Sequence, residues 1–425
     1  MQRSKCVLGI IVVFCLTGFA ALSEQITIKY VHWNALPEDP YNYVEAFEQQ
    51  YPQYKIDFTL IPEAEYPAAL RQMARTGTLP DVLCLWEHDM LEFAEAGYII
   101  PLDQYVAKSE VVNLEDFIPA VRSLVKLQKR LYGLPWCYAT HFLYYNKDLF
   151  DKVGVPYPDD TWTWQNFVDA ARALTDPEAG IYGCDAIVFH GIWFDLIGTF
   201  GDPIIDEQGR FAIGGCAEKL LKGLYQLTKE GVIAKPAALA MGATAVDLFA
   251  AGKAAMAFNG SWMVSQYKDI TDFAWDIAPN PLMVYDGYAR RYAGLHTGFF
   301  AINAKSKVKN AAWKFIEFCL SQEGQRLISE AYANPSARFS VMERGYHEVR
   351  GPKGPTNWEA LWIQAKHGHW GYTLLPPKLW MDTVEDFYSV MLGQLSPSEA
   401  VQRAIARAQD VLGPDKVAPY TPCVP

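Results

Sequence analysis

The sequence lacks the residue patterns that commonly hold metal ions. It contains no Cys-x-x-Cys motif, and its only closely spaced histidines are His367 and His369. Zinc sites are usually built from closely spaced cysteine and histidine ligands. We therefore expect neither a metal ion nor another cofactor.

Basic residues are outnumbered by acidic ones. The 425 residues include 37 Lys and Arg against 48 Asp and Glu, which gives a formal net charge of −11. An acidic surface repels phosphate groups, so we expect no nucleic-acid partner. Hydrophobic residues make up 51% of the chain, which is enough for two packed domains and excludes intrinsic disorder.

Apolar runs of membrane-spanning length are missing after the N-terminus, where residues 7–22 carry no charge. Arg3 and Lys5 precede this run and small residues close it at 20–23, an order typical of a secretory signal peptide. The run is short for a transmembrane helix. We expect a signal peptide over residues 1–23 and a soluble protein exported to the periplasm.

The cysteines leave the question of disulfides open. Cys15 follows Phe14 rather than a small residue, which argues against a lipid anchor. Export permits disulfides, yet a chain of this size does not need them. Cys84 and Cys319 lie in apolar patterns, so we expect both to be buried. The cysteines that follow the signal peptide are Cys84, Cys137, Cys184, Cys216, Cys319 and Cys423.

Strands and helices alternate along the mature chain. Apolar patterns predict strands at 26–30, 56–60 and 82–85, with helices between them. The second of these helices should end at Gly77 in a left-handed conformation. Strand, helix and strand in this order imply a parallel sheet with helices on its faces.

Capping signals extend the α/β pattern to the C-terminus. Thr163, Thr244 and Ser396 each stand where a helix is expected to begin, and Ser396 opens a capping box. Further strands are predicted at 255–258 and 299–302.

Tryptophan is abundant, with 13 residues, and three of them closely follow the ends of predicted strands: Trp33, Trp86 and Trp262. In open α/β sheets, ligands bind beyond the carboxyl ends of the strands, so the three indoles indicate one cleft. Sugars stack their C–H faces on such rings and bond their hydroxyls to carboxylates and amides. Polar neighbours of this kind are Asn34, Glu87, His88, Asp89 and Asn259.

Several motifs together resemble those of one family. They are Gly-Thr-Leu-Pro-Asp-Val at 77–82, Leu-Tyr-Tyr-Asn-Lys-Asp-Leu-Phe at 143–150, Phe-Ala-Ala-Gly-Lys-Ala-Ala-Met at 249–256, Asn-Gly-Ser-Trp at 259–262 and Gly-Phe-Phe-Ala-Ile at 298–302. The order and spacing of these motifs resemble those of the carbohydrate-binding solute-binding proteins of ABC importers, a family that includes the maltodextrin-binding protein. The resemblance spans residues 24–412.

This resemblance implies an α/β, two-lobed periplasmic-binding-protein fold of type II, in which each lobe is a mainly parallel sheet flanked by helices. A multi-strand hinge would join the lobes, with crossings near 136–140, 291–295 and 332–335. The implied lobes are 24–137 with 295–331, and 138–294 with 332–425.

The resemblance also assigns site residues. Trp86, Trp262 and Trp380 match stacking tryptophans of the family, and Trp380 is assigned on this ground alone. The family's sugar-binding carboxylate matches either Glu87 or Asp89, because the local spacing differs by one residue.

The hinge region departs from the maltodextrin binder, which has a glutamate where this chain has Ala139 beside Tyr138 and His141. Maltodextrin is therefore not assumed to be the ligand. Trp193 and His296 could line the cleft or serve the structure. With them included, the expected ligand-binding residues are Trp33, Asn34, Trp86, Glu87, Asp89, Tyr138, Trp193, Asn259, Trp262, His296 and Trp380.

These observations favour a monomeric, non-catalytic receptor that captures a carbohydrate and delivers it to a transmembrane permease with a cytoplasmic ATPase. The many aromatic residues favour an oligosaccharide as that carbohydrate. A polyamine or glycerol phosphate receptor stays open as an alternative. The strand-end motifs lack the basic cluster that a phosphate would favour, whereas the acidic charge suits a polyamine. A secreted glycoside-active enzyme is disfavoured, since no two acids stand in separate strand-end motifs.

Overall fold

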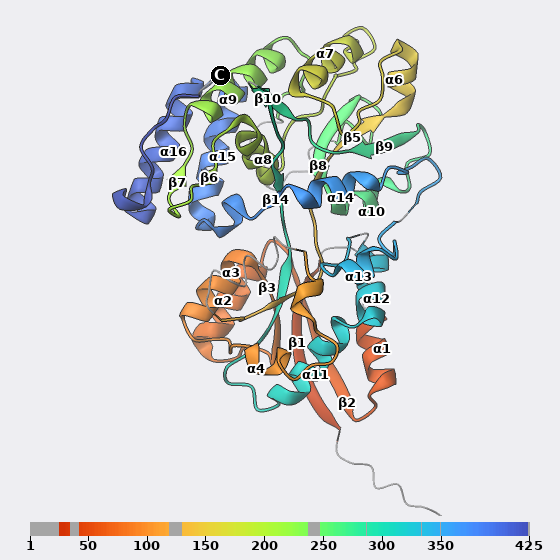
Figure 1. The fold of residues 1–425 in the computed structure, drawn as a ribbon, viewed down its shortest axis with the longest axis vertical. Coiled ribbons are helices and arrows are strands. Elements are labelled where there is room, and N and C mark those ends of the chain that lie inside the picture. The colour runs from red at the N-terminus through yellow and green to blue at the C-terminus, as the bar shows by residue number, and fades with distance from the viewer. Residues whose placement is uncertain are drawn as a thin grey trace, which may run out of the picture.

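The computed structural model describes residues 25–34, 42–118, 130–236, 247–285, 287–332, 334–348 and 350–423. These residues form two lobes arranged along the long axis of the molecule (Figure 1). The expected signal peptide and the expected cap at Thr244 lie outside the described residues.

The lobe that contains the N-terminal strand is built on a five-stranded sheet of order β2-β1-β3-β13-β4. The first three strands in the chain pair in parallel, as predicted, whereas β13 runs antiparallel to both β3 and β4. The strands are β1 (Ile26–Asn34), β2 (Tyr54–Pro62), β3 (Val82–Trp86), β4 (Leu134–Pro135) and β13 (Gly298–Ile302).

Helices cover both faces of this sheet (Figure 1). On one face, the ring of Tyr30 packs against Phe315 of α11, and on the other the Tyr66 hydroxyl of α2 donates to the Cys84 carbonyl at 2.6 Å. Helix α2 ends at Gly77 with a φ of 71°, which confirms the predicted left-handed end. The helices of this lobe are α1 (Asn42–Gln50), α2 (Tyr66–Thr76), α3 (Glu87–Glu95), α4 (Asp103–Val106), α11 (Lys309–Cys319) and α12 (Gln322–Tyr332).

The second lobe contains a three-stranded sheet of order β8-β5-β9, with β5 (His141–Asn146), β8 (Met256–Gly260) and β9 (Trp275–Ala278). All of its pairs are antiparallel, so the prediction of a mainly parallel sheet is wrong for this lobe. The strands come from distant parts of the chain, and an apolar strand pattern carries no information about the direction of such pairing.

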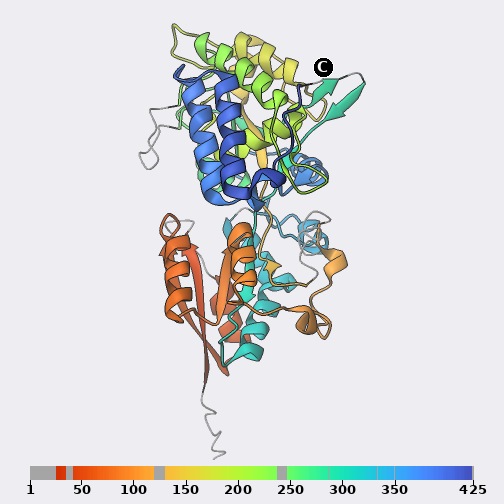
Figure 2. The same ribbon diagram turned by 90° about the vertical axis from the view of Figure 1, so that its left-hand side faces the viewer.

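Helices surround this smaller sheet, and Figure 2 shows several of them from the side. Thr163 and Ser396 each form a complete capping box at the start of a helix, which confirms both predictions. The longer helices are α6 (Lys147–Val153), α7 (Trp164–Leu174), α8 (His190–Phe200), α9 (Gly215–Lys229), α14 (Glu359–Lys366), α15 (Pro377–Met391) and α16 (Pro397–Leu412).

Short elements complete the described chain. They are β6 (Ile204–Ile205), β7 (Phe211–Ala212), α10 (Val264–Tyr267), β10 (Met283–Tyr285), β11 (Tyr288–Arg290), β12 (Ala293–Gly294), α13 (Phe339–Met342), β14 (Gly368–His369) and the 3-10 turns η1 (Leu114–Asp116), η2 (Ser261–Met263), η3 (Gly371–Leu374) and η4 (Pro414–Lys416).

Segments that cross between the lobes are hydrogen-bonded to one another. Ala139 and His296 exchange two backbone hydrogen bonds of 2.9 and 3.0 Å, and the Tyr138 N–H donates to the Pro335 carbonyl at 2.8 Å. The Leu295 N–H donates to the His369 carbonyl at 3.0 Å. These contacts lie at or beside the three predicted crossings, while the lobe boundaries stay predictions.

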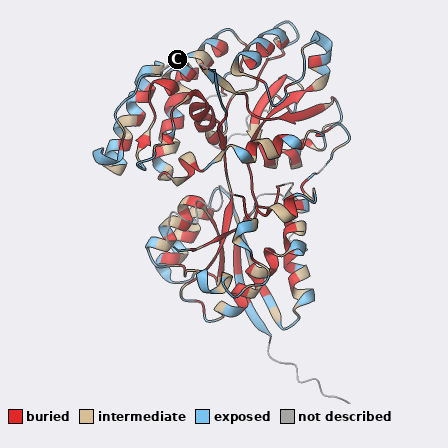
Figure 3. Ribbon diagram, viewed as in Figure 1, coloured by how far each residue is buried: buried red, intermediate tan, exposed pale blue. Residues whose placement is uncertain are grey.

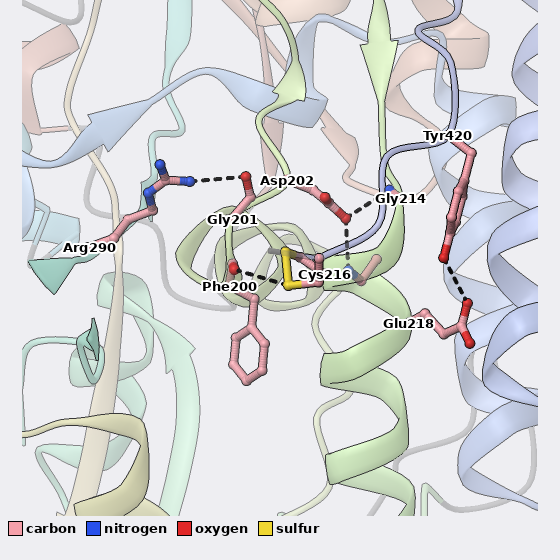
Figure 4. The surroundings of a disulfide bond; sticks show 10 residues. Phe200, Gly201, Asp202, Gly214, Cys216, Glu218, Arg290 and Tyr420 are labelled. Atoms are coloured by element: carbon pink, nitrogen blue, oxygen red, sulfur yellow. Dashed lines mark hydrogen bonds between the residues drawn. A yellow bond between two sulfur atoms is a disulfide. The ribbon is translucent and has the colours of Figure 1, made fainter. Parts of the chain in front are cut away.

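Buried residues fill the interior of both lobes and continue through the junction (Figure 3). Cys84 and Cys319 are fully buried, as predicted. Cys216 and Cys423 form a disulfide, which joins the start of α9 to the C-terminal segment (Figure 4). Within the described ranges, no helix has the length and apolar character needed to cross a bilayer.

Candidate functional site

Most of the predicted site residues that the structure describes lie where the lobes meet. Two cavities of about 600 and 620 Å³ lie elsewhere, beside the hairpin β10–β11 of the second lobe, and none of the predicted site residues lines either of them. The candidate site therefore lies among the side chains at the junction of the lobes.

Two tryptophans form an aromatic wall on the first lobe. Strands β1 and β3 are parallel neighbours, so their carboxyl ends bring Trp33 and Trp86 together with ring centroids 5.3 Å apart. Tyr66 and Trp136 contact Trp33 edge-on at 5.6 and 5.7 Å. Trp33 is buried by these rings, and Trp86 is partly exposed. Asn34 ends β1, but its side chain lies outside the described part of the structure.

Two acidic residues lie in the first turn of α3, where the positive end of the helix dipole favours negative charge. Glu87 is buried and accepts the Thr297 N–H at 2.7 Å. Burial raises the pKa of Glu87 to about 8. The carboxyl group is therefore mostly protonated at pH 7 in the folded protein.

Asp89 presents an oxygen that has no hydrogen-bond partner among the residues that the structure describes. Its side chain is 1% exposed, and its Oδ1 accepts the Arg71 Nη2–H at 2.6 Å. Its Oδ2 is buried without a hydrogen-bond partner. Burial raises the pKa of Asp89, against the lowering effect of the charges on His88 and Arg71. A buried acceptor without a donor is costly, so this oxygen is suited to receive a ligand hydroxyl.

A second aromatic group lies on the other lobe around Trp262. Its ring centroid is 4.9 Å from Phe189, 5.9 Å from His141 and 6.0 Å from His296. The ring folds back over Gly260, where an added Cβ would come within 2.2 Å of it. This contact explains why a glycine stands two residues before the tryptophan.

Trp380 joins the same group through its neighbours. It stacks on His190 at 4.3 Å and meets Tyr372 edge-on at 5.6 Å, and the Tyr372 hydroxyl lies 3.3 Å from Nε2 of His296. Burial lowers the pKa of His190 to about 3. Burial likewise holds the pKa of His296 well below its ordinary value. Both imidazoles are therefore neutral at pH 7.

Trp193 does not line the junction, in contrast to its inclusion among the expected ligand-binding residues. It is 1% exposed, and its ring packs against Phe387 and Tyr388 of α15 at 5.7 and 5.9 Å. Helix α8 is buried on all sides, so its sequence pattern could not show which face would point toward the junction.

Asn259 and Tyr138 take structural positions. The Asn259 Oδ1 accepts the Gly260 N–H at 2.9 Å, which supports the turn that leads to Trp262. Tyr138 is buried within the crossing segment. Asn259 is partly exposed, as Trp86 and Trp262 are, and the buried Tyr138 hydroxyl has no hydrogen-bond partner among the described residues.

Other residues of the junction were not selected from the sequence as ligand-binding residues. Phe189 and His190 stand at the start of α8, and no strand-end signal points to them. Arg71 lies on α2, where its only sequence signal is a position on the polar face of the helix. Within the described residues, no group of three or more His, Cys, Asp or Glu side chains is arranged to hold a metal ion.

Solved structures with the same architecture define the class of the fold. A substrate-binding protein from Listeria monocytogenes, in complex with cycloalternan, superposes with a TM-score of 0.79 and 24% identity over 92% of this chain and 99% of that one. The sugar-binding protein MalE of Xanthomonas citri gives a TM-score of 0.76 and 21% identity over 91% and 97% of the two chains. The fold is that of a two-lobed periplasmic binding protein of type II, as predicted.

Sequence comparison identifies the family. The chain belongs to the bacterial extracellular solute-binding proteins, whose family model matches residues 36–326. Among its relatives, the maltotriose-binding protein of Pyrococcus abyssi is 26% identical over 300 residues, which cover 68% of this chain and 62% of that protein. The mannitol-binding protein of Pseudomonas aeruginosa is 28% identical over 325 residues, 71% of each chain. Members of this family act outside the cytoplasm.

Proposed function

We propose that the protein captures a carbohydrate between its lobes and delivers it to the transmembrane permease of an ABC importer with a cytoplasmic ATPase. The observation that carries this proposal is the junction itself. Each lobe contributes tryptophan rings, and the first lobe adds Asp89 with an unsatisfied buried oxygen. Aromatic faces and a bare acceptor meet the two needs of a sugar ring.

The relatives support a polyhydroxylated ligand. One is named for maltotriose, an oligosaccharide, and another for mannitol, a polyol. For this chain we favour an oligosaccharide, because tryptophans from both lobes offer more stacking surface than one sugar ring needs.

Lobe opening is part of the proposed cycle. Asp89 is almost fully enclosed in this structure, so a solute reaches it only when the lobes move apart about the crossing segments. The ligand then stabilises the closed form through contacts that exist only when both lobes are engaged. We further propose that residues 1–23 are a cleaved signal peptide, that no lipid anchors the chain and that the receptor acts as a monomer.

For the site, we propose that Trp33, Asn34, Trp86 and Asp89 contact the sugar from the first lobe. Asp89 is preferred to Glu87 as the sugar-binding carboxylate, because Arg71 binds its Oδ1 and leaves its Oδ2 free for a ligand. The proposed contacts from the second lobe are Trp262, His296 and Trp380.

Isothermal titration calorimetry against maltotriose, mannitol, cycloalternan and spermidine tests the proposal. We expect the wild type to bind at least one of the three carbohydrates, and Trp262→Ala to weaken that binding at least about tenfold through lost stacking. Trp362→Ala is the matched control, since Trp362 is partly buried and stacks on Phe339 away from the site. Binding of spermidine alone would overturn the carbohydrate assignment, and unchanged affinity in folded Trp262→Ala would overturn the site.

A further inference from the structure

A buried histidine–aspartate pair stands beside the proposed sugar site without a role so far. His141 begins β5 and is 0% exposed, and Asp195 on α8 is 1% exposed. Nδ1 of His141 lies 2.6 Å from Oδ2 of Asp195. The Asn280 amide also approaches this oxygen, at 3.4 Å. We assign the proton of this contact to Nδ1 of the imidazole, with the Asp195 oxygen as the acceptor.

The surrounding backbone holds the pair in place. A Cβ added at Gly191 would lie 2.6 Å from Cε1 of His141, and one added at Gly294 would lie 2.5 Å from Oδ1 of Asp195. The backbone at Gly191 and Gly294 therefore packs directly against the pair. The imidazole is fixed in orientation by its neighbours as well as by its hydrogen bond.

The other ring nitrogen is left without a partner. Nε2 of His141 is buried and makes no hydrogen bond to any residue in the described part of the chain. With the proton on Nδ1, a neutral imidazole offers Nε2 as an acceptor. Leaving such an acceptor bare destabilises the folded protein, so its retention needs a reason.

The position of the ring supplies that reason. Its centroid is 4.7 Å from His296, 5.1 Å from Phe189 and 5.9 Å from Trp262, so it lies within the aromatic group of the second lobe. A ring stacked on Trp262 would have its hydroxyls next to His141. The arrangement also parallels Asp89 on the first lobe, where Arg71 holds one oxygen and leaves the other bare.

We infer that His141 is the polar anchor of the second lobe, and that its Nε2 accepts a hydrogen bond from a hydroxyl group of the bound carbohydrate. Asp195 is a positioning residue that fixes the tautomer and the orientation of the ring. The inference rests on the proposed function. His141 would then supply the second lobe with a hydrogen-bond acceptor for a sugar hydroxyl. The hinge itself supplies no acidic side chain at position 139, where the chain has Ala139.

Two substitutions at position 141 separate its two nitrogens. The amide of His141→Asn can replace Nδ1 and keep the bond to Asp195, whereas the longer His141→Gln places an amide near the position of Nε2. We expect His141→Asn to lose at least about tenfold in affinity and His141→Gln to lose less. His347→Asn is the matched control, because His347 is also buried with a bare Nε2 but packs against Trp358 outside the site.

Calorimetry with maltotriose, mannitol and cycloalternan gives the affinities, and thermal melting shows that each variant folds. Wild-type affinity in folded His141→Asn, or an equal loss in His347→Asn, would overturn the anchor. If the wild type binds none of the three probes, the proposed function fails and the anchor falls with it. If it binds one and only Trp262→Ala weakens binding, the proposed function stands and the anchor alone is wrong.

Nitrogen NMR of the wild-type imidazole tests the inference without a variant at position 141. We expect a signal typical of an Nδ1–H tautomer that moves at Nε2 when a bound probe is added. Asp195→Asn should disturb the tautomer before ligand is added, which a purely structural role in packing would not do. An Nε2 signal that stays unchanged on binding would overturn the anchor.

Discussion

Replacing Glu87 with glutamine should stabilise the folded protein at neutral pH. The carboxyl group is buried, and its pKa is raised from the ordinary 4.5 to about 8. At pH 7 it is therefore protonated in the folded state and ionised in the unfolded chain. Glutamine is neutral in both states, and its amide oxygen can still accept the Thr297 N–H, which Glu87 accepts at 2.7 Å.

The size of the effect follows from the two pKa values. The pKa of Glu87 is higher in the folded state than in the unfolded chain. Its contribution to the unfolding free energy is therefore complete below pH 4.5 and is lost as the pH rises through 8. One pKa unit corresponds to about 1.4 kcal/mol, so at pH 7 the wild type has lost about 3 kcal/mol of unfolding free energy through this group. At pH 5 it has lost only about 1 kcal/mol. The glutamine variant should lose nothing over this range.

Urea unfolding followed by tryptophan fluorescence at pH 5, 7 and 8.5 measures the difference. Glu95→Gln is the matched control, because Glu95 is exposed at the other end of the same helix. We expect its effect to stay within about 0.5 kcal/mol at each pH. A Glu87→Gln variant with the same advantage at pH 5 and 8.5, or with less stability than wild type at pH 7, would refute the reasoning.

Three further predictions concern other parts of the fold. Burial lowers the pKa of His347 from 6.5 to about 4. The unfolding free energy of the wild type should therefore fall by about 3 kcal/mol as the pH falls from 6.5 to 4. His347→Asn has no imidazole to protonate, so its urea unfolding should not show this decrease. Gly260→Ala should displace the Trp262 ring and weaken carbohydrate binding about tenfold in calorimetry, and unchanged affinity would mean that the ring is not held as described. Replacing Cys216 and Cys423 with serine should lower the unfolding free energy by about 2–4 kcal/mol with no change in carbohydrate affinity, and equal melting temperatures with and without reductant in the wild type would contradict it.

Features set by neighbours in the sequence were predictable. The left-handed end at Gly77 and the capping boxes at Thr163 and Ser396 each depend on a few adjacent residues. The aromatic pair of Trp33 and Trp86 was also predictable, because parallel neighbouring strands bring their carboxyl ends together.

Features that depend on distant segments were not predictable. The pair of His141 and Asp195 joins residues 54 positions apart, and neither stands in a motif that suggests the contact. Whether Trp193 lines the cleft or packs inside the lobe could not be decided from the sequence, because a helix that is apolar all round shows no preferred buried face. The antiparallel sheet of the second lobe and the partners of the cysteines likewise depend on contacts that local patterns do not encode.

The late strand β13 has a consequence for how the chain folds. It pairs with both β3 and β4, so the first sheet stays incomplete until residues 298–302 have been synthesised. Until then β3 lacks its partner on that side, and an apolar strand with an unpaired edge is prone to associate with other chains. These pairings join residues that are far apart in the sequence, which also slows folding. The chain must lose the entropy of closing a long loop before the stabilising contacts can form. The N-terminal lobe should therefore acquire protease resistance only once residues 298–302 are available to pair, although its first strand is the first to be made.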